Sequence, residues 1–300
     1  MATTSRITQR WVAQHLPPRP ARAHKGTFGR VLVVAGSLEY AGAALLSGLG
    51  AARAGAGLVC LATPESVGLR LFGRVPELTS ILLPEEAPGL VAPGGWRQLA
   101  TLADSFEAVV IGPGLGRHAG TLRRTRGLMG EVRRPMVIDA DALSALAERD
   151  RWWRSISAPA VLTPHPGEFV RLKRTPLVDL PDVDDAREQA AREAALLWGH
   201  VVALKGANTV VAHPDGDILR SDVATPALAT AGSGDVLAGA IGAFLAAGLA
   251  PFEAAACGVG VHGAAGVLAE QRLGKAGAMA SDIAALLPEA MAMLRGDRAR

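Results

Sequence analysis

The sequence predicts a three-layer α/β domain, in which one doubly wound, mostly parallel sheet carries helices on both faces. Short apolar runs rich in β-branched residues alternate with Ala- and Gly-rich helical runs along the whole chain. The apolar runs are continuous, which is typical of strands covered on both sides. Of the 300 residues, 49% are hydrophobic and 20% are charged, so a large buried core is expected.

The individual elements follow from these runs. Strands are predicted at 30–36, 57–63, 108–112, 136–139, 160–163 and 201–205. Segments 209–212 and 217–219 can form a hairpin around Pro214-Asp215-Gly216. Helices are predicted at 42–55, 142–147, 236–247 and 251–272.

We find no internal repeat and no low-complexity linker. Residues 83–95, rich in Pro, Glu and Gly, are expected to form a surface loop rather than a domain boundary. Residues 1–300 are therefore expected to fold as a single domain, with residues 1–24 as an N-terminal lead-in.

Composition argues against several functional classes. The net charge is only +3 and the basic residues are dispersed, so no nucleic-acid partner is expected. The apolar segments 236–251 and 254–268 look too short to span a membrane, and the polar N-terminus lacks the apolar core of a signal peptide. Cys60 and Cys257 lack metal-ligand or redox spacing and are expected to be buried free thiols. A cytoplasmic protein with no membrane partner is the resulting expectation.

Polar and Gly-rich residues follow several of the predicted strands. Open α/β sheets bind ligands beyond the carboxyl ends of their strands, so these residues are expected to line one crevice. They fall at 36–37, 112–116, 139–141, 163–168 and 205–208. Several strand ends pointing at one crevice favour an enzyme.

Residues 230–239 (TAGSGDVLAG) combine a Gly-rich turn with a helix start. Free N–H groups in the first helical turn and the helix dipole stabilise a negative charge such as a transferring phosphate. Asp235 in that turn can accept a proton from an attacking hydroxyl, or it can simply cap the helix. No Gly-Lys-Ser/Thr follows, so the motif is not a Walker A loop.

Three further loops have both a functional and a structural interpretation. Lys205 and the turn after it (KGANT) can hold phosphate oxygens, or form an ordinary hairpin turn with a surface lysine. In TPHPGE, His165 can bind a substrate and Glu168 can orient a metal-bound water, or Glu168 can merely begin a helix. The glycines of 112–116 can lie against a flat ligand or form a bare turn.

Asp139 and Asp141 can bind Mg²⁺ through water or cap the helix that follows them. A direct metal site at His165 is not supported, because no second His or Cys lies at ligand spacing. Residues 25–37 and 40–42 surround the first strand with small residues that leave space for a substrate, although Gly42, Ala43 and Ala44 also suit close helix–sheet packing.

Taken in order, these stretches resemble the ADP-dependent (S)-NAD(P)H-hydrate dehydratase family of the ribokinase-like superfamily. The resemblance covers residues 25–288. It rests on KGTFGRVLVVAGS, YAGAA, GPGLG, VIDADAL, LTPHPGEF, LKGANTVVA, ATAGSGDVLAG and ASDIAALLP. The GSGD motif is shared by many ribokinase-like kinases, whereas the KGxxG opening with TPHPGE and KGANT is typical of the dehydratases.

The resemblance implies a repair lyase for nicotinamide nucleotides. Its substrates would be the hydrated cofactors NADHX and NADPHX, with ADP as co-substrate and Mg²⁺ as cofactor. The ring hydroxyl would attack the β-phosphorus of ADP, giving AMP and a phosphorylated hydrate, and loss of phosphate would restore NADH or NADPH. A homo-oligomer, expected to be a tetramer, and a separate epimerase are also implied.

The resemblance also implies roles for individual residues. Asp235 would be the catalytic base, and the backbone amides of Gly232, Ser233 and Gly234 would form the anion hole. The remaining positions are assigned to the nucleotide (Lys205, Gly206, Ala207, Asn208, Thr209 and Gly234) and to the hydrate (Gly42, Ala43, Gly114, His165 and Asp235). No direct metal ligand is assigned, and Glu168 would support Mg²⁺ through water.

Two positions depart from the family pattern, because Thr225 and Ser144 stand where relatives often have Asn. Only about two dozen residues precede Lys25, so no epimerase domain is expected within this chain. The competing interpretations are an ATP-dependent kinase of a small alcohol, of the hydroxyethylthiazole or hydroxymethylpyrimidine type, and a non-catalytic nucleotide sensor on the same scaffold. The first would release a stable phosphorylated product, and the second would bind ADP without phosphoryl transfer.

Overall fold

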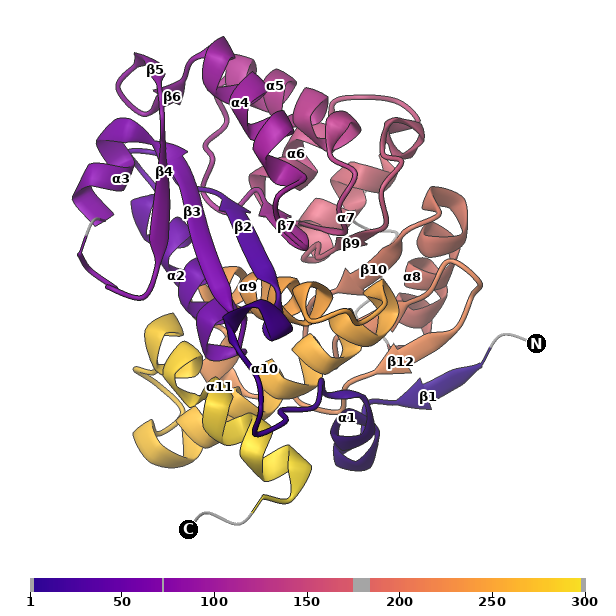
Figure 1. Ribbon diagram of the computed structural model, residues 1–300. Helices are drawn as coiled ribbons and strands as arrows, with labels where there is room; N and C mark the ends of the chain where they lie inside the picture. Colours follow the sequence, from indigo (N-terminus) through magenta and orange to yellow (C-terminus); the bar gives the residue numbers. More distant parts are fainter. Residues whose placement is uncertain (1–2, 72, 175–183, 298–300) are drawn as a thin grey trace.

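The computed structural model describes residues 3–71, 73–174 and 184–297, and these form a twisted ten-stranded sheet between two layers of helices (Figure 1). The strands are β1 (Thr4–Arg6), β2 (Arg30–Val34), β3 (Leu58–Pro64), β4 (Thr79–Leu83), β7 (Ala108–Ile111), β8 (Met136–Ile138), β9 (Ala160–Leu162), β10 (Val201–Leu204), β11 (Val210–Ala212) and β12 (Ile218–Arg220). A separate two-stranded sheet consists of β5 (Glu85–Ala87) and β6 (Leu90–Val91).

The strand order across the main sheet is β1-β12-β11-β10-β9-β8-β7-β2-β3-β4. All neighbours are parallel except β11, which pairs antiparallel with both β10 and β12. The predicted doubly wound, mostly parallel sheet is therefore confirmed, and so is the hairpin around residues 214–216. Each strand predicted before that hairpin starts within one residue of its expected position.

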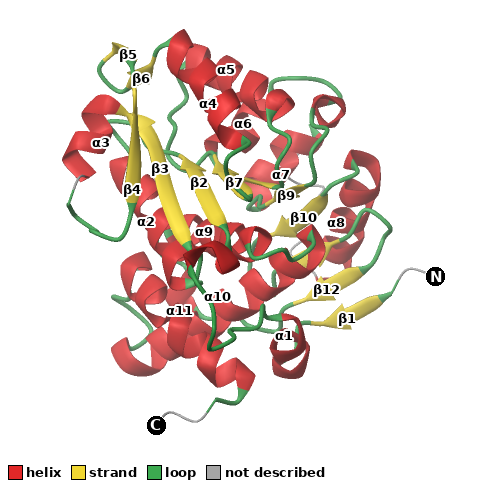
Figure 2. Ribbon diagram, in the orientation of Figure 1, coloured by secondary structure: helices red, strands yellow, loops and turns green. Residues whose placement is uncertain are grey.

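The helices are α1 (Gln9–His15), α2 (Ala41–Arg53), α3 (Glu65–Leu71), α4 (Pro93–Ala103), α5 (Ala119–Glu131), α6 (Asp141–Ala147), α7 (Pro166–Lys173), α8 (Asp184–Trp198), α9 (Ser233–Ala246), α10 (Pro251–Leu273) and α11 (Ala280–Arg295). Figure 2 shows the strands crossing the middle of the domain, with α4, α5 and α6 on one side and α9, α10 and α11 on the other.

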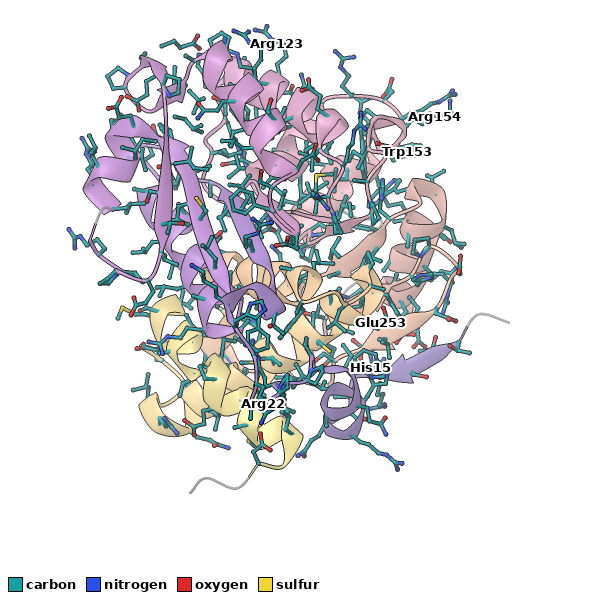
Figure 3. All side chains as sticks on the ribbon, in the orientation of Figure 1. His15, Arg22, Arg123, Trp153, Arg154 and Glu253 are labelled. Carbon is teal, nitrogen blue, oxygen red and sulfur yellow. The ribbon has the colours of Figure 1, made fainter. Side chains whose placement is uncertain are left out.

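The two faces of the sheet bury different side chains, because successive residues of a strand point to opposite sides. In β2, Val31 and Val33 pack in a core shared with α2, α9, α10 and α11. Leu32 and Val34 pack in a second core shared with α4 to α8. These cores explain why the strands are continuously apolar. The exposed Arg123 and Arg154 point away from the domain, which fits dispersed surface arginines (Figure 3).

Helices α2 and α9 approach each other closely through glycine. A Cβ atom on Gly50 would lie 2.2 Å from the carbonyl oxygen of Val236, and one on Gly239 would lie 2.0 Å from that of Ser47. Neither contact leaves room for a side chain. This packing holds the first turns of α9 against the middle and the second half of α2.

Several regions differ from the sequence-based expectation. The lead-in joins the sheet, because β1 pairs in parallel with β12. The prediction of a loop over 83–95 was wrong, since this stretch forms the β5–β6 hairpin and begins α4. Gly89, with φ +77°, forms the turn of the β5–β6 hairpin, and Pro93 lies in the first turn of α4. Both residues therefore lie at the ends of helices or strands and do not indicate an irregular loop.

Helix α10 also differs from the expectation in the length of its apolar stretch. Its 23 residues are long and apolar enough to cross a membrane, so the expectation from residues 254–268 that this stretch is too short was wrong. About 72% of its most apolar window is buried inside the domain. Contacts within the core therefore account for its apolar character.

Candidate active site

The start of α9 is built as an anion-binding turn. Gly232 precedes the helix with φ +87°, a conformation that favours glycine, and a Cβ atom there would lie 2.4 Å from Leu46 Cδ1. No side chain caps this helix end. Asp235, in the first turn, is therefore not a cap, and the capping interpretation is wrong. Its carboxylate is available for another role.

Two cavities flank this turn. The first encloses about 600 Å³ and is lined by Lys205, Gly206, Ala207, Thr209, Val223, Ala224, Thr225, Pro226, Leu228, Ala229, Thr230, Ser233, Gly234, Leu237 and His262. The second encloses about 520 Å³ and is lined by Glu39, Tyr40, Ala43, Gly114, Arg117, Ala140, Asp141, Glu168 and Asp235. Gly234 lines the first cavity and its chain neighbour Asp235 lines the second. One helical turn thus stands between two ligand-sized spaces.

Most residues expected to contact the nucleotide line the first cavity. Lys205, Gly206, Ala207, Thr209 and Gly234 are among them, but Asn208 is not. The Asn208 side chain donates hydrogen bonds to the Asp184 carboxylate, the nearer oxygen at 3.3 Å.

Of the residues expected to contact the hydrate, three line the second cavity and two do not. Ala43, Gly114 and Asp235 line the second cavity. Gly42 is exposed, with open space where a Cβ would point. His165 caps α7 by accepting a hydrogen bond from Gly167 N–H at 3.0 Å, and its side chain is 52% exposed. Neither Gly42 nor His165 is among the residues that line this cavity.

A charged cluster joins three strand ends beside the turn. Lys205 Nζ lies 2.8 Å from Asp139 Oδ1 and 4.0 Å from Glu168 Oε2. Burial lowers the pKa of Lys205, but the Asp139 and Glu168 carboxylates outweigh it, so the pKa is raised and the ammonium stays charged. Lys205 is therefore not the surface lysine of an ordinary turn.

Two carboxyl groups near this cluster have raised pKa values. Burial, aided by the negative charge of Asp139, raises the pKa of Asp235 to about 7. Burial likewise raises the pKa of Glu168 to about 7, against the opposing effect of Lys205. Glu168 also accepts a hydrogen bond from His165 N–H at 2.9 Å, so it does help to begin α7. A carboxylate with a pKa near 7 suits general base catalysis near neutral pH.

Arg187, in α8, binds the end of β10 and the start of the loop that follows it. This residue is buried, and its guanidinium donates hydrogen bonds to the carbonyl oxygens of Lys205, at 3.0 Å, and Leu204, at 3.4 Å. Holding these carbonyls fixes the turn that presents residues 205–209 to the first cavity. No sequence pattern distinguishes Arg187, because α8 is Ala-rich and contains a second arginine, Arg192.

Asp141 contacts the glycine loop that follows β7. It accepts hydrogen bonds from Gly116 N–H at 2.9 Å and from Arg117 Nε at 3.2 Å. Helix α6 begins after Ala140 without a side-chain cap, so neither Asp139 nor Asp141 caps it. Over the described ranges, no group of three or more His, Cys, Asp or Glu residues could hold a metal ion directly.

Other lining residues were also missed. His262, from the middle of α10, contacts Ser233 at the start of α9. Thr225 and Ser144 stand where the family often has Asn. The Thr225 hydroxyl donates a hydrogen bond to the Glu270 carboxylate and caps the 3₁₀ turn Pro226–Leu228. Ser144 Oγ lies 3.5 Å from the carbonyl oxygen of Ala140. No sequence pattern indicates a role for His262. It lies in the apolar helix α10, and Ser233, which it contacts, is 29 residues earlier in the sequence.

Known proteins are similar to this chain over most of its length. The sequence model of the NAD(P)H-hydrate dehydratase family matches residues 31–289. The ADP-dependent (S)-NAD(P)H-hydrate dehydratase of Bacillus subtilis is 35% identical over 260 residues, covering 85% of this chain and 87% of that protein. A crystal structure of the ADP/ATP-dependent NAD(P)H-hydrate dehydratase from Bacillus subtilis, co-crystallized with ATP/Mg²⁺, superposes with a TM-score of 0.83 at 33% identity, covering 97% of this chain and 98% of that one.

A longer relative is the bifunctional NAD(P)H-hydrate repair enzyme of Moorella thermoacetica, which is 40% identical over 282 residues. The match covers 94% of this chain but 53% of that protein, so the chain spans about half the length of this relative. The family match, the sequence identity and the superposed structure agree with the observed fold. The chain belongs to the NAD(P)H-hydrate dehydratase family.

Proposed function

We propose that this protein dehydrates the S-form of hydrated NADH and NADPH, using ADP and releasing AMP and phosphate. One observation carries the proposal: Gly234 and Asp235, adjacent in the first turn of α9, line different cavities. A nucleotide in the first cavity and a hydroxyl-bearing ring in the second would meet across this turn. Proximity of this kind is what phosphoryl transfer requires.

The first cavity suits ADP. Lys205 supplies a positive charge, and the N–H groups of residues 232–234 offer donors at a helix start. Val223, Pro226 and Leu228 give another part of the cavity apolar walls, which suit a flat base. In this pose the β-phosphate would lie toward Gly234 and the base toward residues 223–229.

The second cavity would hold the hydrated nicotinamide ring. Asp235 accepts the proton of the ring hydroxyl while the hydroxyl oxygen attacks the β-phosphorus and the bond from that phosphorus to the bridging oxygen breaks, releasing AMP. The carbon–oxygen bond then breaks with its electron pair leaving on phosphate, and loss of a proton from the neighbouring ring carbon restores the double bond. Phosphate is a far better leaving group than hydroxide, which is why a kinase-like site serves a dehydration.

Magnesium fits the donor set as a hydrated ion. Asp139, Glu168 and Asp235 supply oxygen donors with more negative charge than Lys205 alone balances. We propose that Mg²⁺ accompanies the ADP phosphates and keeps most of its water, with Glu168 supporting it through one of these waters. When bound, it neutralises phosphate charge.

Further parts of the proposal concern the setting of the enzyme. Cys60 and Cys257 are buried free thiols, which agrees with a reducing compartment, and we propose a cytoplasmic location. We also propose a homo-oligomer, expected to be a tetramer, which light scattering after gel filtration would test. An enzyme specific for the S-form needs an epimerase that converts the R-form, so a separate epimerase is the expected functional partner.

The test is to mix the protein with NADHX and either ADP or ATP, and to follow the return of reduced-nicotinamide absorbance together with AMP or ADP release. Recovery of NADH with stoichiometric AMP from ADP supports the proposal. No recovery with either nucleotide contradicts it. Phosphorylation of a hydroxyethylthiazole or hydroxymethylpyrimidine by ATP would favour the kinase alternative instead.

A further inference from the structure

His262 is a buried histidine that the reaction outlined above does not use. It lies in the middle of α10, is 7% exposed and lines the first cavity. Its Nε2 atom lies 3.0 Å from the carbonyl oxygen of Ser233 and 3.1 Å from Ser233 Oγ. One ring nitrogen therefore contacts both oxygens of the residue at the centre of the Gly-Ser-Gly turn.

These two contacts determine where the imidazole proton lies. A carbonyl oxygen can only accept, so Nε2 must carry a hydrogen. Burial lowers the pKa of His262 to about 4, so the ring is neutral near pH 7 and Nδ1 has no proton. The Nε2–H group then faces Ser233 Oγ as a donor, and Oγ is the acceptor of that contact.

The hydroxyl hydrogen of Ser233 is consequently left to be donated elsewhere. Within the described ranges, the contact with His262 is the only hydrogen bond of Ser233 Oγ. Ser233 is 4% exposed and lines the cavity that would hold the nucleotide. A buried hydroxyl with an unused hydrogen costs free energy unless an acceptor arrives. A phosphate oxygen is such an acceptor.

The same contact orients the backbone. The Ser233 carbonyl belongs to the peptide group that also contains the N–H of Gly234, and the two point in opposite directions in a planar trans peptide. Holding the carbonyl through His262 therefore fixes the direction of the Gly234 N–H, one of the donors of the anion hole.

We propose that His262 is a positioning residue that holds Ser233 so that its hydroxyl, in addition to the neighbouring backbone amides, donates to a phosphate of the bound nucleotide. The inference rests on the proposed function, because it takes ADP as the occupant of the first cavity. It adds to that function a side-chain donor and the group that orients it.

The test is a double-mutant cycle on ADP binding and turnover. Ser233→Ala removes the hydroxyl but keeps the amides, and we expect ADP affinity or kcat to fall on the order of ten- to a hundredfold. His262→Leu should cause a comparable loss. The double variant should be no more impaired than the more impaired of the two single variants. Losses that multiply, or a Ser233→Ala variant with wild-type ADP affinity and kcat, would overturn the inference.

Ser47→Ala is the matched control. Ser47 is a buried serine on α2, packed against α9, and its hydroxyl has no hydrogen-bond partner among the described residues. This variant should keep wild-type ADP affinity and kcat. An equal loss in Ser47→Ala would mean that any disturbance of α9 has this effect, which also overturns the inference.

A second measurement needs no substitution at His262, in case His262→Leu does not fold. Nitrogen-15 NMR of the wild-type protein reports which ring nitrogen carries the hydrogen, and we expect Nε2. A proton on Nδ1 alone would overturn the inference. If the wild-type protein returns no NADH, the proposed function fails, while ADP affinities measured by calorimetry still decide the role of Ser233.

Discussion

Lys205 Nζ lies 2.8 Å from Asp139 Oδ1, which joins the carboxyl ends of β10 and β8 across 66 residues of sequence. Glu168, in the first turn of α7 after the intervening strand β9, lies 4.0 Å from the same ammonium. The segments that follow three adjacent strands thus each contribute one charged side chain to this cluster. This cluster sets the charge of the lysine and the pKa values of the acids around it.

Lys205→Met should weaken ADP binding by about tenfold or more, because the phosphates lose a desolvated positive charge. It should also lower the free energy of unfolding by about 3 kcal/mol, because Asp139 is left buried without its partner. Calorimetry with ADP and denaturant unfolding check the two effects. Lys173→Met is the control: Lys173 pairs with Glu193 at 3.7 Å, and Glu193 is more than half exposed, so neither property should change noticeably. Equal behaviour of the two variants would contradict this account.

Activity should depend on the ionisation of Asp235. Since the pKa of this carboxyl is raised to about 7, kcat/KM should rise with pH and level off above a midpoint near 7. Glu168→Gln removes a neighbouring negative charge that raises the pKa of Asp235, so its midpoint should lie lower. The titration of ADP itself is common to both enzymes, so the difference belongs to the protein. A midpoint near 4, or one unmoved by Glu168→Gln, would be inconsistent with this role.

The same pKa values predict how stability varies with pH. Asp235 and Glu168 have folded pKa values raised from 3.8 and 4.5 to about 7, so between those limits the folded state binds more protons than the unfolded state. Their contribution to the free energy of unfolding therefore falls as pH rises from about 4 to 7. Asp235→Asn should reduce this fall by roughly 1–3 kcal/mol, measured by urea unfolding at pH 5 and 7.5. An identical fall in both proteins would show that Asp235 is not ionised against a burial penalty.

The two cavities should be separable by substitution. Ala43→Leu adds bulk to the second cavity, so KM for the hydrate should rise about tenfold while ADP affinity stays unchanged. Ala229→Leu adds bulk to the first, with the opposite result expected. Each variant is the control for the other, using steady-state kinetics and calorimetry. If both variants impaired the same ligand, the assignment of the cavities would have to be abandoned.

The fold was largely predictable because its signals are local and repeated. Continuous apolar runs predicted β2, β3, β7, β8, β9 and β10 within one or two residues of each boundary. The edge strands β1 and β4 were missed. All three residues of β1 are exposed and only one of the five residues of β4 is buried, so neither strand has the long apolar run of the central strands. Edge strands are identified by their pairing partners, and pairing is not visible in a local pattern.

The site was predictable where chemistry follows a strand directly, as at Lys205 and Asp139. It was not predictable where a contact depends on packing between helices. His262 reaches Ser233 only because α10 lies against α9, and Arg187 reaches the Lys205 carbonyl only because α8 covers β10. The sequence pattern around Asp235 is compatible with both a cap and a base, and only the uncapped start of α9 excludes the cap.

The most direct test of the central claim uses Asp235→Asn with Asp185→Asn, an exposed aspartate in the first turn of α8, as the matched control. ADP affinity is measured by calorimetry, and AMP release is measured with NADHX present. Asp235→Asn should bind ADP with near wild-type affinity, because residues 232–234 and Lys205 are intact, yet release AMP at least about a thousandfold more slowly. Asp185→Asn should match the wild type in both. Near-normal AMP release by Asp235→Asn would contradict the account.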